Sequence, residues 1–104
     1  MDPAVQRIDP RDREEIVRIL APLAQRHQAI VYLFGSRARG DARRTSDIDL
    51  AVRAAMPIPA DTLAEAKQAL EDSRVPFRVD LVDYETAASE LRQAIDAEGV
   101  AWIG

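Results

Sequence analysis

The chain has 104 residues, of which 47% are hydrophobic and 31% charged, with a net charge of −4 and no cysteine. This balance fits one globular domain spanning residues 1–104, excludes disulfides and thiolate metal sites, and argues against a protein that coats nucleic acid. No stretch approaches the ~18 apolar residues that span a bilayer, and no signal peptide is visible, so we expect a cytoplasmic protein with no membrane and no direct nucleic-acid partner.

The first helix is predicted over residues 10–26. Asp9 fits its N-cap, and Pro10 fits the first helical position, where a missing N–H costs nothing. The apolar residues follow the spacing of one helical face: Ile16, Ile19, Leu20, Leu23 and Ala24. Pro22 lies inside this segment and is expected to kink the helix or to split it in two.

Two strands are predicted on either side of an arginine-rich segment. The run "AIVYLFG" at 29–35 is apolar, β-branched and aromatic, which is typical of a strand buried on both faces. Gly35 and Ser36 then open a polar stretch with room for only a short helix. The run "SDIDLAVR" at 46–53 begins with alternating polar and apolar residues and predicts the second strand.

The rest of the chain continues this alternation of helices and strands. A helix is predicted over 61–72 with Asp61 as its cap, and a third strand over 77–84. A last helix over 86–98 ends at Gly99, and the final residues fit a short edge strand. Interleaved helices and strands predict an α/β or α+β domain.

The segment at 33–52, "LFGSRARGDARRTSDIDLAV", fits either a phosphate-binding P-loop or a metal site. Gly35 and Gly40 have the P-loop spacing and follow a predicted strand. That motif requires Lys and then Ser or Thr after its second glycine, whereas Asp41 and Ala42 stand there. The P-loop interpretation therefore fails.

The metal interpretation depends on three aspartates. Asp47 and Asp49 are two positions apart on a predicted strand, so their side chains leave one face with Cα atoms roughly 6.5 Å apart. Asp80 lies between apolar residues on the third strand and can join them if the two strands are neighbours. Three carboxylates on one face repel each other unless a cation neutralises them, and carboxylate oxygens suit Mg²⁺.

Two such ions, roughly 3.5–4 Å apart, would hold the attacking and the leaving oxygen of a phosphoryl or nucleotidyl transfer. The alternatives are two ordinary solvent-facing aspartates on the second strand, and an Asp80 that is paired with Arg78 or another arginine. Both alternatives stay open at this point.

The Gly35-Ser36 turn can then hold a triphosphate. Gly35 lets a phosphate approach the backbone, and Ser36 can donate its hydroxyl or cap the short helix. Positive charge is available from the arginines that follow: Arg37, Arg39, Arg43 and Arg44. The alternatives are an ordinary strand-to-helix turn and a solvated basic face.

The string "GSRARGDARRTSDIDLAV" resembles the signature of the DNA polymerase β-like nucleotidyltransferase superfamily, and within it the minimal nucleotidyltransferase (MNT) branch. The resemblance covers most of the chain. It implies a small polymerase β-like nucleotidyltransferase fold, with a mixed three- to four-stranded sheet packed against helices. It also implies transfer of a nucleoside monophosphate from a nucleotide such as ATP to a hydroxyl, with release of pyrophosphate.

The resemblance also implies roles for the residues above. Asp47 and Asp49 would ligate two Mg²⁺ ions, and Asp80 would ligate the catalytic ion and help to activate the acceptor hydroxyl. Gly35 and Ser36 would bind the triphosphate, with Arg37 and Arg39 expected beside them.

Many minimal members resemble the antitoxin of a toxin–antitoxin pair, whose partner is an all-helical HEPN protein encoded nearby. The implied reaction attaches AMP from ATP to a tyrosine of that toxin, within an assembly of the two proteins. Two alternatives remain: an antitoxin that neutralises its partner by binding without catalysis, and a nucleotidyltransferase for small molecules.

Overall fold

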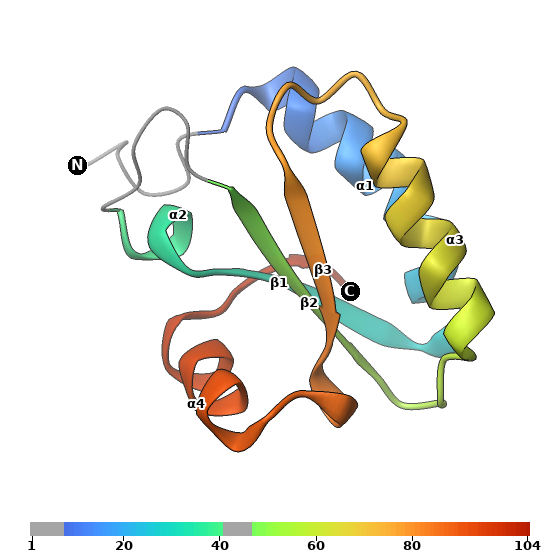
Figure 1. Ribbon diagram of the computed structural model, residues 1–104, viewed down its shortest axis with the longest axis vertical. Helices are drawn as coiled ribbons and strands as arrows, with labels where there is room; N and C mark the ends of the chain where they lie inside the picture. Colours follow the sequence, from blue (N-terminus) through green and yellow to red (C-terminus); the bar gives the residue numbers. More distant parts are fainter. Residues whose placement is uncertain (1–7, 41–46) are drawn as a thin grey trace.

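The computed structural model describes residues 8–40 and 47–104 and places a four-stranded sheet between helices (Figure 1). The helices are α1 (Pro10–His27), α2 (Ser36–Arg39), α3 (Ala60–Glu71) and α4 (Ser89–Glu98), with a 3₁₀ turn at Tyr84–Thr86. The strands are β1 (Ala29–Phe34), β2 (Ile48–Ala54), β3 (Val79–Asp83) and β4 (Val100–Ile103). The predicted order of helices and strands is confirmed, including the short helix after β1 and the terminal strand.

The sheet has the strand order β3-β2-β1-β4. β1 pairs antiparallel with β2 and with β4, whereas β2 and β3 run parallel, so the sheet is mixed. A parallel pair needs a crossover connection, and α3 supplies it between β2 and β3. This arrangement confirms the predicted α/β (α+β) class, and it makes the second and third strands neighbours, as the metal interpretation required.

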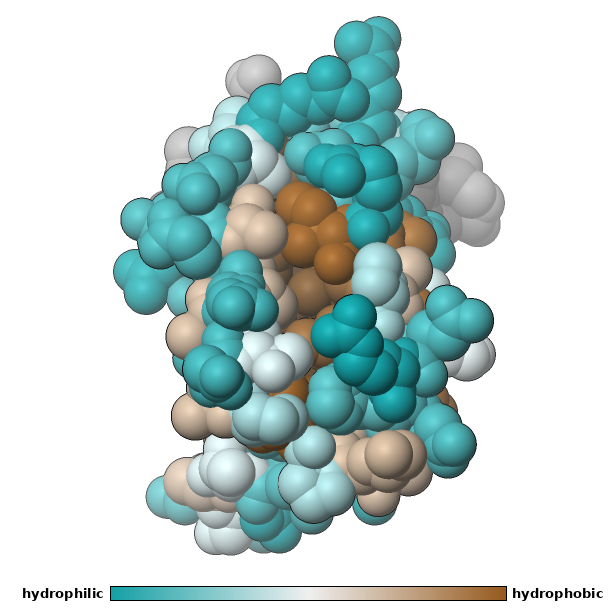
Figure 2. Space-filling model, turned by 90° about the vertical axis from the view of Figure 1, so that its right-hand side faces the viewer, coloured by the Kyte–Doolittle hydropathy of each residue, from teal (hydrophilic) through white to brown (hydrophobic). Residues whose placement is uncertain are grey.

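The larger core lies between the sheet and the pair α1 and α3, while α4 packs on the opposite face (Figure 1). The α1 and α3 side of the sheet buries alternate strand residues, among them Val31, Leu33, Ile48 and Leu50. Figure 2 shows the helix-covered side from outside, where hydrophilic side chains predominate and hydrophobic ones lie mainly in a recess between them. Both helices are therefore amphipathic, as their periodicity predicted.

The prediction that Pro22 splits the first helix in two is wrong, whereas its alternative of a kink stays a prediction. α1 runs unbroken from Pro10 to His27, with Pro22 on its exposed side. Solvent can therefore hydrate the carbonyl that loses its N–H donor. Asp9 caps the helix as predicted, because its carboxylate accepts the backbone N–H of Arg11 at 2.8 Å.

Three further expectations need correction. β1 is buried on both faces only toward its end at Phe34, and Ile30 is 37% exposed because the small cluster under α4 does not reach it. α3 has Pro59 rather than Asp61 at its N-cap. α4 begins at Ser89, later than predicted, because the preceding residues form the 3₁₀ turn. None of these differences moves a candidate site residue to another element.

Candidate active site

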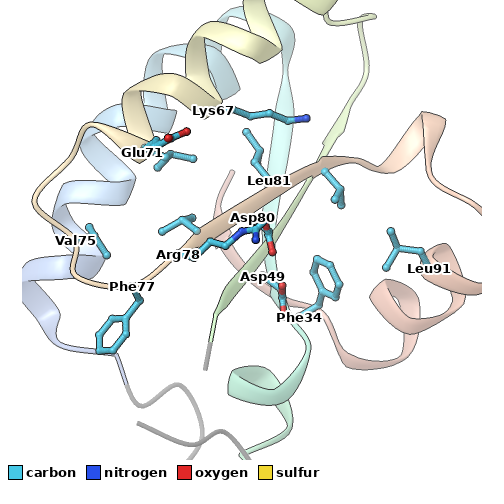
Figure 3. Close-up of a pocket in the computed structure, with 13 residues that line it drawn as sticks. Phe34, Asp49, Lys67, Glu71, Val75, Phe77, Arg78, Asp80, Leu81 and Leu91 are labelled. Atoms are coloured by element: carbon cyan, nitrogen blue, oxygen red, sulfur yellow. The ribbon is translucent and has the colours of Figure 1, made fainter. Parts of the chain in front are cut away.

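One row of paired residues crosses three strands on the face of the sheet that α4 covers. Phe34 on β1 is the register partner of Asp49 on β2, and Asp49 is the register partner of Asp80 on β3. Figure 3 shows the Asp49 and Asp80 carboxylates next to each other, close to the Phe34 ring. The two aspartates that are 31 positions apart in the sequence are therefore direct neighbours in the sheet.

Asp47 lies immediately before β2 and not inside it, because the strand begins at Ile48. Ile48 is fully buried in the core on the α1 and α3 side, so the expected apolar face of this strand is confirmed, whereas the expectation that Asp47 lies on the strand is wrong. Asp47 is exposed and Asp49 is partly buried. The second aspartate is thus held by the sheet, while the first lies at its edge.

The Asp49 carboxyl has a pKa above its usual range. Burial is the main cause, followed by the negative charges of Asp80 and Asp47, while Arg39 and Arg37 offset part of the effect. Burial and the two neighbouring charges therefore destabilise the ionised form of Asp49, which is the electrostatic situation that a bound cation relieves.

Asp80 has a second neighbour. The Nε of Arg78 donates to its Oδ1 at 3.0 Å, so the ion pair considered from the sequence is present beside the contact with Asp49. In residues 8–40 and 47–104, no three acidic or histidine side chains converge closely enough to hold a metal ion. Asp49 and Asp80 still offer adjacent oxygen donors, which is the chemistry that Mg²⁺ prefers, so this donor set fits the cation that the sequence suggested.

The turn at Gly35 lies directly against the acidic pair. Gly35 has φ 78°, which favours glycine, and a Cβ there would collide with the Asp49 carboxylate. Ser36 is the first residue of α2, whose N-cap is Gly35, so the suggestion that Ser36 caps this helix is wrong. Because Gly35 has no side chain, the turn can lie directly against the Asp49 carboxylate.

The two arginines of α2 lie in different environments. Arg37 is 2% exposed, with its guanidinium 4.7 Å from the centre of the Phe77 ring. Burial lowers the pKa of Arg37, an effect that Asp12, Asp47 and Asp49 partly offset. Arg39 is exposed and pairs with Glu98 at 3.1 Å. Arg43 and Arg44 lie outside the described residues.

Glu98 is a site residue that sequence reasoning missed. Its Oε1 accepts the backbone N–H of Gly35 at 3.2 Å, in addition to its bonds with Arg39. Glu98 is the last residue of α4, more than fifty positions from both partners. No local sequence pattern signals such a contact.

A groove of about 990 Å³ runs over β3 and contains both aspartates of the row (Figure 3). Phe34 and Leu91 line it on the α4 side, and Lys67 and Glu71 of α3 line it on the other. Phe77 and Arg78, which also line the groove, lie immediately before β3. The candidate site therefore opens to the surface along the outer strand of the sheet.

No helix in the described part of the chain is long and apolar enough to cross a membrane.

A mixed sheet that presents neighbouring carboxylates beside a Gly-Ser turn is the arrangement expected of a nucleotidyltransferase. Residues 14–103 match the family described as "Polymerase beta, Nucleotidyltransferase", and the chain belongs to this family. The resemblance inferred from the sequence is thereby confirmed.

Two curated relatives carry the name protein adenylyltransferase, one of them as a probable one. The chain is 38% identical over 65 residues to the probable protein adenylyltransferase MntA of Haemophilus influenzae, covering 62% of this chain and 57% of the relative. It is 35% identical over 88 residues to the protein adenylyltransferase MntA of Shewanella oneidensis, covering 85% and 62% respectively. The chain thus spans about three fifths of the length of the curated relatives it matches.

Two solved toxin–antitoxin structures are also similar to this chain. A toxin–antitoxin crystal structure with AMP-PNP matches with a TM-score of 0.70 and 33% identity, over 88% of this chain and 73% of that one. A structure of tri-AMPylated Shewanella oneidensis HEPN toxin in complex with MNT antitoxin matches with a TM-score of 0.65 and 29% identity, over 89% and 70%.

Proposed function

We propose that this chain is a Mg²⁺-dependent nucleotidyltransferase that transfers AMP from ATP to a tyrosine of a HEPN-type toxin, and that it acts as the antitoxin of that pair. The names of the relatives support the reaction, since both are named as protein adenylyltransferases. The structural neighbours support the partner and the nucleotide, since one contains an AMPylated HEPN toxin and another contains AMP-PNP, an ATP analogue.

The observation that carries the proposal is the contact between the Gly35 turn and the Asp49–Asp80 pair. We assign Asp49 and Asp80, together with Asp47 at the edge of the sheet, to two Mg²⁺ ions, which would draw the three carboxylates together and neutralise phosphate charge when bound. Gly35, together with the neighbouring Ser36, would place the triphosphate beside these carboxylates.

The reaction requires one bond to form and one to break. The acceptor oxygen attacks the α-phosphorus of ATP, the bond from that phosphorus to the bridging oxygen breaks, and pyrophosphate leaves. Asp80 lines the groove on the outer strand, which supports our assignment of this residue to orient the acceptor hydroxyl and to receive its proton. Asp49 lies deeper and is better placed toward the nucleotide.

The arginines of α2 are assigned different tasks. Arg39 is exposed and lies next to the turn, so it is the α2 arginine that we assign to the triphosphate. Arg37 is almost completely buried, so we assign it to fixing α2 against Phe77 and not to direct contact with the nucleotide. The sequence alone led us to expect both arginines beside the nucleotide, whereas we now assign only Arg39 to it.

Mass spectrometry of the toxin tests the transfer. The purified chain is incubated with ATP, Mg²⁺ and its HEPN partner, and the partner is expected to gain the mass of AMP on a tyrosine. The double variant Asp49→Asn with Asp80→Asn should give no gain, whereas Glu90→Gln, an exposed change on α4 outside the groove lining, should behave as wild type. An unmodified toxin with the wild-type chain would contradict the proposal.

Growth of cells that express the toxin separates catalysis from binding. If catalysis neutralises the toxin, the double variant should fail to restore growth even though it still co-purifies with the toxin. Full rescue by the double variant would favour the alternative of an antitoxin that acts by contact. A screen that finds AMP on a metabolite and none on the toxin would favour the small-molecule alternative.

A further inference from the structure

The carboxylate of Glu98 is held by two donors that come from the same turn. The backbone N–H of Gly35 donates to its Oε1 at 3.2 Å. The Nη1 of Arg39 donates to Oε1 at 3.2 Å and to Oε2 at 3.1 Å. Gly35 is the N-cap of the single-turn helix α2 and Arg39 is its last residue, so donors from both ends of α2 converge on a single anionic group.

We propose that Glu98 occupies the position of a nucleotide phosphate in the nucleotide-free protein, and that the triphosphate displaces it on binding. This inference rests on the proposed function, which assigns Gly35 and Arg39 to the triphosphate. Glu98 is then a positioning residue that keeps the turn formed before nucleotide arrives and lowers the affinity for nucleotide.

The electrostatic surroundings favour displacement. Glu98 is the last residue of α4, where the negative end of the helix dipole disfavours a carboxylate. The ion pair is partly open to solvent, since the Arg39 side chain is 45% exposed and the Glu98 side chain 23%. Exposed pairs of this kind contribute little stability. A phosphate group carries more charge and matches the arginine fork, so it competes well for the same donors.

The Asp49 carboxylate is a second negative charge beside the turn. Its carboxylate is in contact range of Gly35, so the nucleotide-free turn lies between two carboxylates. Moving Glu98 away would leave Asp49 facing the phosphates, where cations are expected to offset its charge. The helix end need not unfold, because the Gly99 N–H donates to the Ile95 carbonyl at 2.8 Å independently of the Glu98 side chain.

Titration calorimetry with AMP-PNP and Mg²⁺ tests the inference on the Glu98→Gln variant. This variant keeps the shape of the side chain and removes its charge, so we expect it to bind AMP-PNP about two- to fivefold more tightly than wild type. Glu90→Gln is the matched control on the same helix and should leave the affinity unchanged. In an Arg39→Gln background the gain from Glu98→Gln should shrink, because the shared donor is gone.

A measurement on the wild-type protein complements the variants. The side-chain carboxyl carbon of Glu98 should change its NMR shift when AMP-PNP and Mg²⁺ saturate the protein, whereas that of Glu90 should not. If wild type binds AMP-PNP but Glu98→Gln binds equally or more weakly, the inference is overturned while the proposed function stands. If neither protein binds AMP-PNP, the proposed function fails as well.

Discussion

Asp49 and Asp80 are register partners on the parallel strands β2 and β3, and both belong to the face of the sheet that α4 covers. Like charges directly opposite each other on neighbouring strands destabilise a sheet. Burial is the main cause of the raised pKa of Asp49, and the charge of Asp80 adds to it. The protein therefore keeps an arrangement that weakens its fold, which is expected where the arrangement serves a site.

The first prediction concerns Asp49→Asn, which should stabilise the protein at neutral pH. A carboxyl whose pKa is raised on folding stabilises the protein most below its unfolded pKa, and this contribution is lost as pH rises through the folded pKa. The neutral amide avoids that loss, so the melting temperature at pH 7.5 should rise by about 2–4 °C. The gain should disappear below about pH 4, where the wild-type carboxyl is protonated.

Thermal melts at the two pH values test whether Asp49→Asn raises the melting temperature only at the higher pH. Glu65→Gln removes one negative charge from an exposed position on α3 and serves as the control for net charge. A gain for Asp49→Asn that persists unchanged in acid, or a loss at pH 7.5, would show that repulsion in the row is not the cause.

The second prediction concerns Gly35→Ala. Gly35 has φ 78° and ψ −158°, a conformation that costs an L-residue about 1–3 kcal/mol, and the added methyl group must also push the Asp49 carboxylate aside. We expect a loss of about 2–3 kcal/mol in the free energy of unfolding, together with loss of transfer activity. Urea unfolding measures the first quantity.

Two comparisons isolate the role of the carboxylate. Gly40 has φ 86° and ψ 10°, so Gly40→Ala reports the cost of the ordinary left-handed conformation at the other end of α2. In an Asp49→Ala background, Gly35→Ala should be less costly because the carboxylate is gone. Equal costs in both backgrounds would show that the contact with Asp49 does not matter.

The order of the elements and the face of most strand residues could be read from local patterns. Ile48 and Leu50 alternate with Asp49, so the sequence predicts which side of β2 meets the larger core. The pairing of Asp49 with Asp80 could be stated only as a condition, because strand order depends on the crossover through α3.

Other features depend on packing between distant segments. Arg37 and Arg39 are two positions apart in one short helix and look alike in the sequence, yet one lies over the Phe77 ring and the other is exposed. The contact of Glu98 with Gly35 joins residues 63 positions apart. Such contacts follow from the tertiary arrangement, and no period or motif encodes them.

The third prediction separates the two arginines of α2. Arg37→Lys should lower the free energy of unfolding by about 1–2 kcal/mol, because lysine cannot stack a planar group on Phe77 in that buried position. Arg39→Lys should change it by less than about 0.5 kcal/mol but weaken AMP-PNP binding. Urea unfolding and calorimetry give the two quantities, and equal stability losses for both variants would contradict the division.

The fourth prediction concerns Arg78→Gln. The Arg78 side chain is 75% exposed and its ion pair with Asp80 competes with any cation for the same carboxylate. Removing the guanidinium should tighten Mg²⁺ binding by about two- to fivefold, measured by calorimetry with MgCl₂. Arg74→Gln, an exposed change outside the groove lining, is the control. Weaker Mg²⁺ binding by Arg78→Gln would contradict this competition and show that Arg78 helps Asp80 to bind the ion.

The most direct test of the central claim is the fate of the two ends of ATP. The chain is incubated with Mg²⁺, its HEPN partner and ATP labelled at either the α- or the γ-phosphate. We predict that the α-label appears on the partner and the γ-label is released as pyrophosphate, and that Asp80→Asn abolishes the transfer while Glu90→Gln does not. Transfer of the γ-label, or equal transfer of the α-label by Asp80→Asn, would contradict an AMP transfer at the Asp49–Asp80 row.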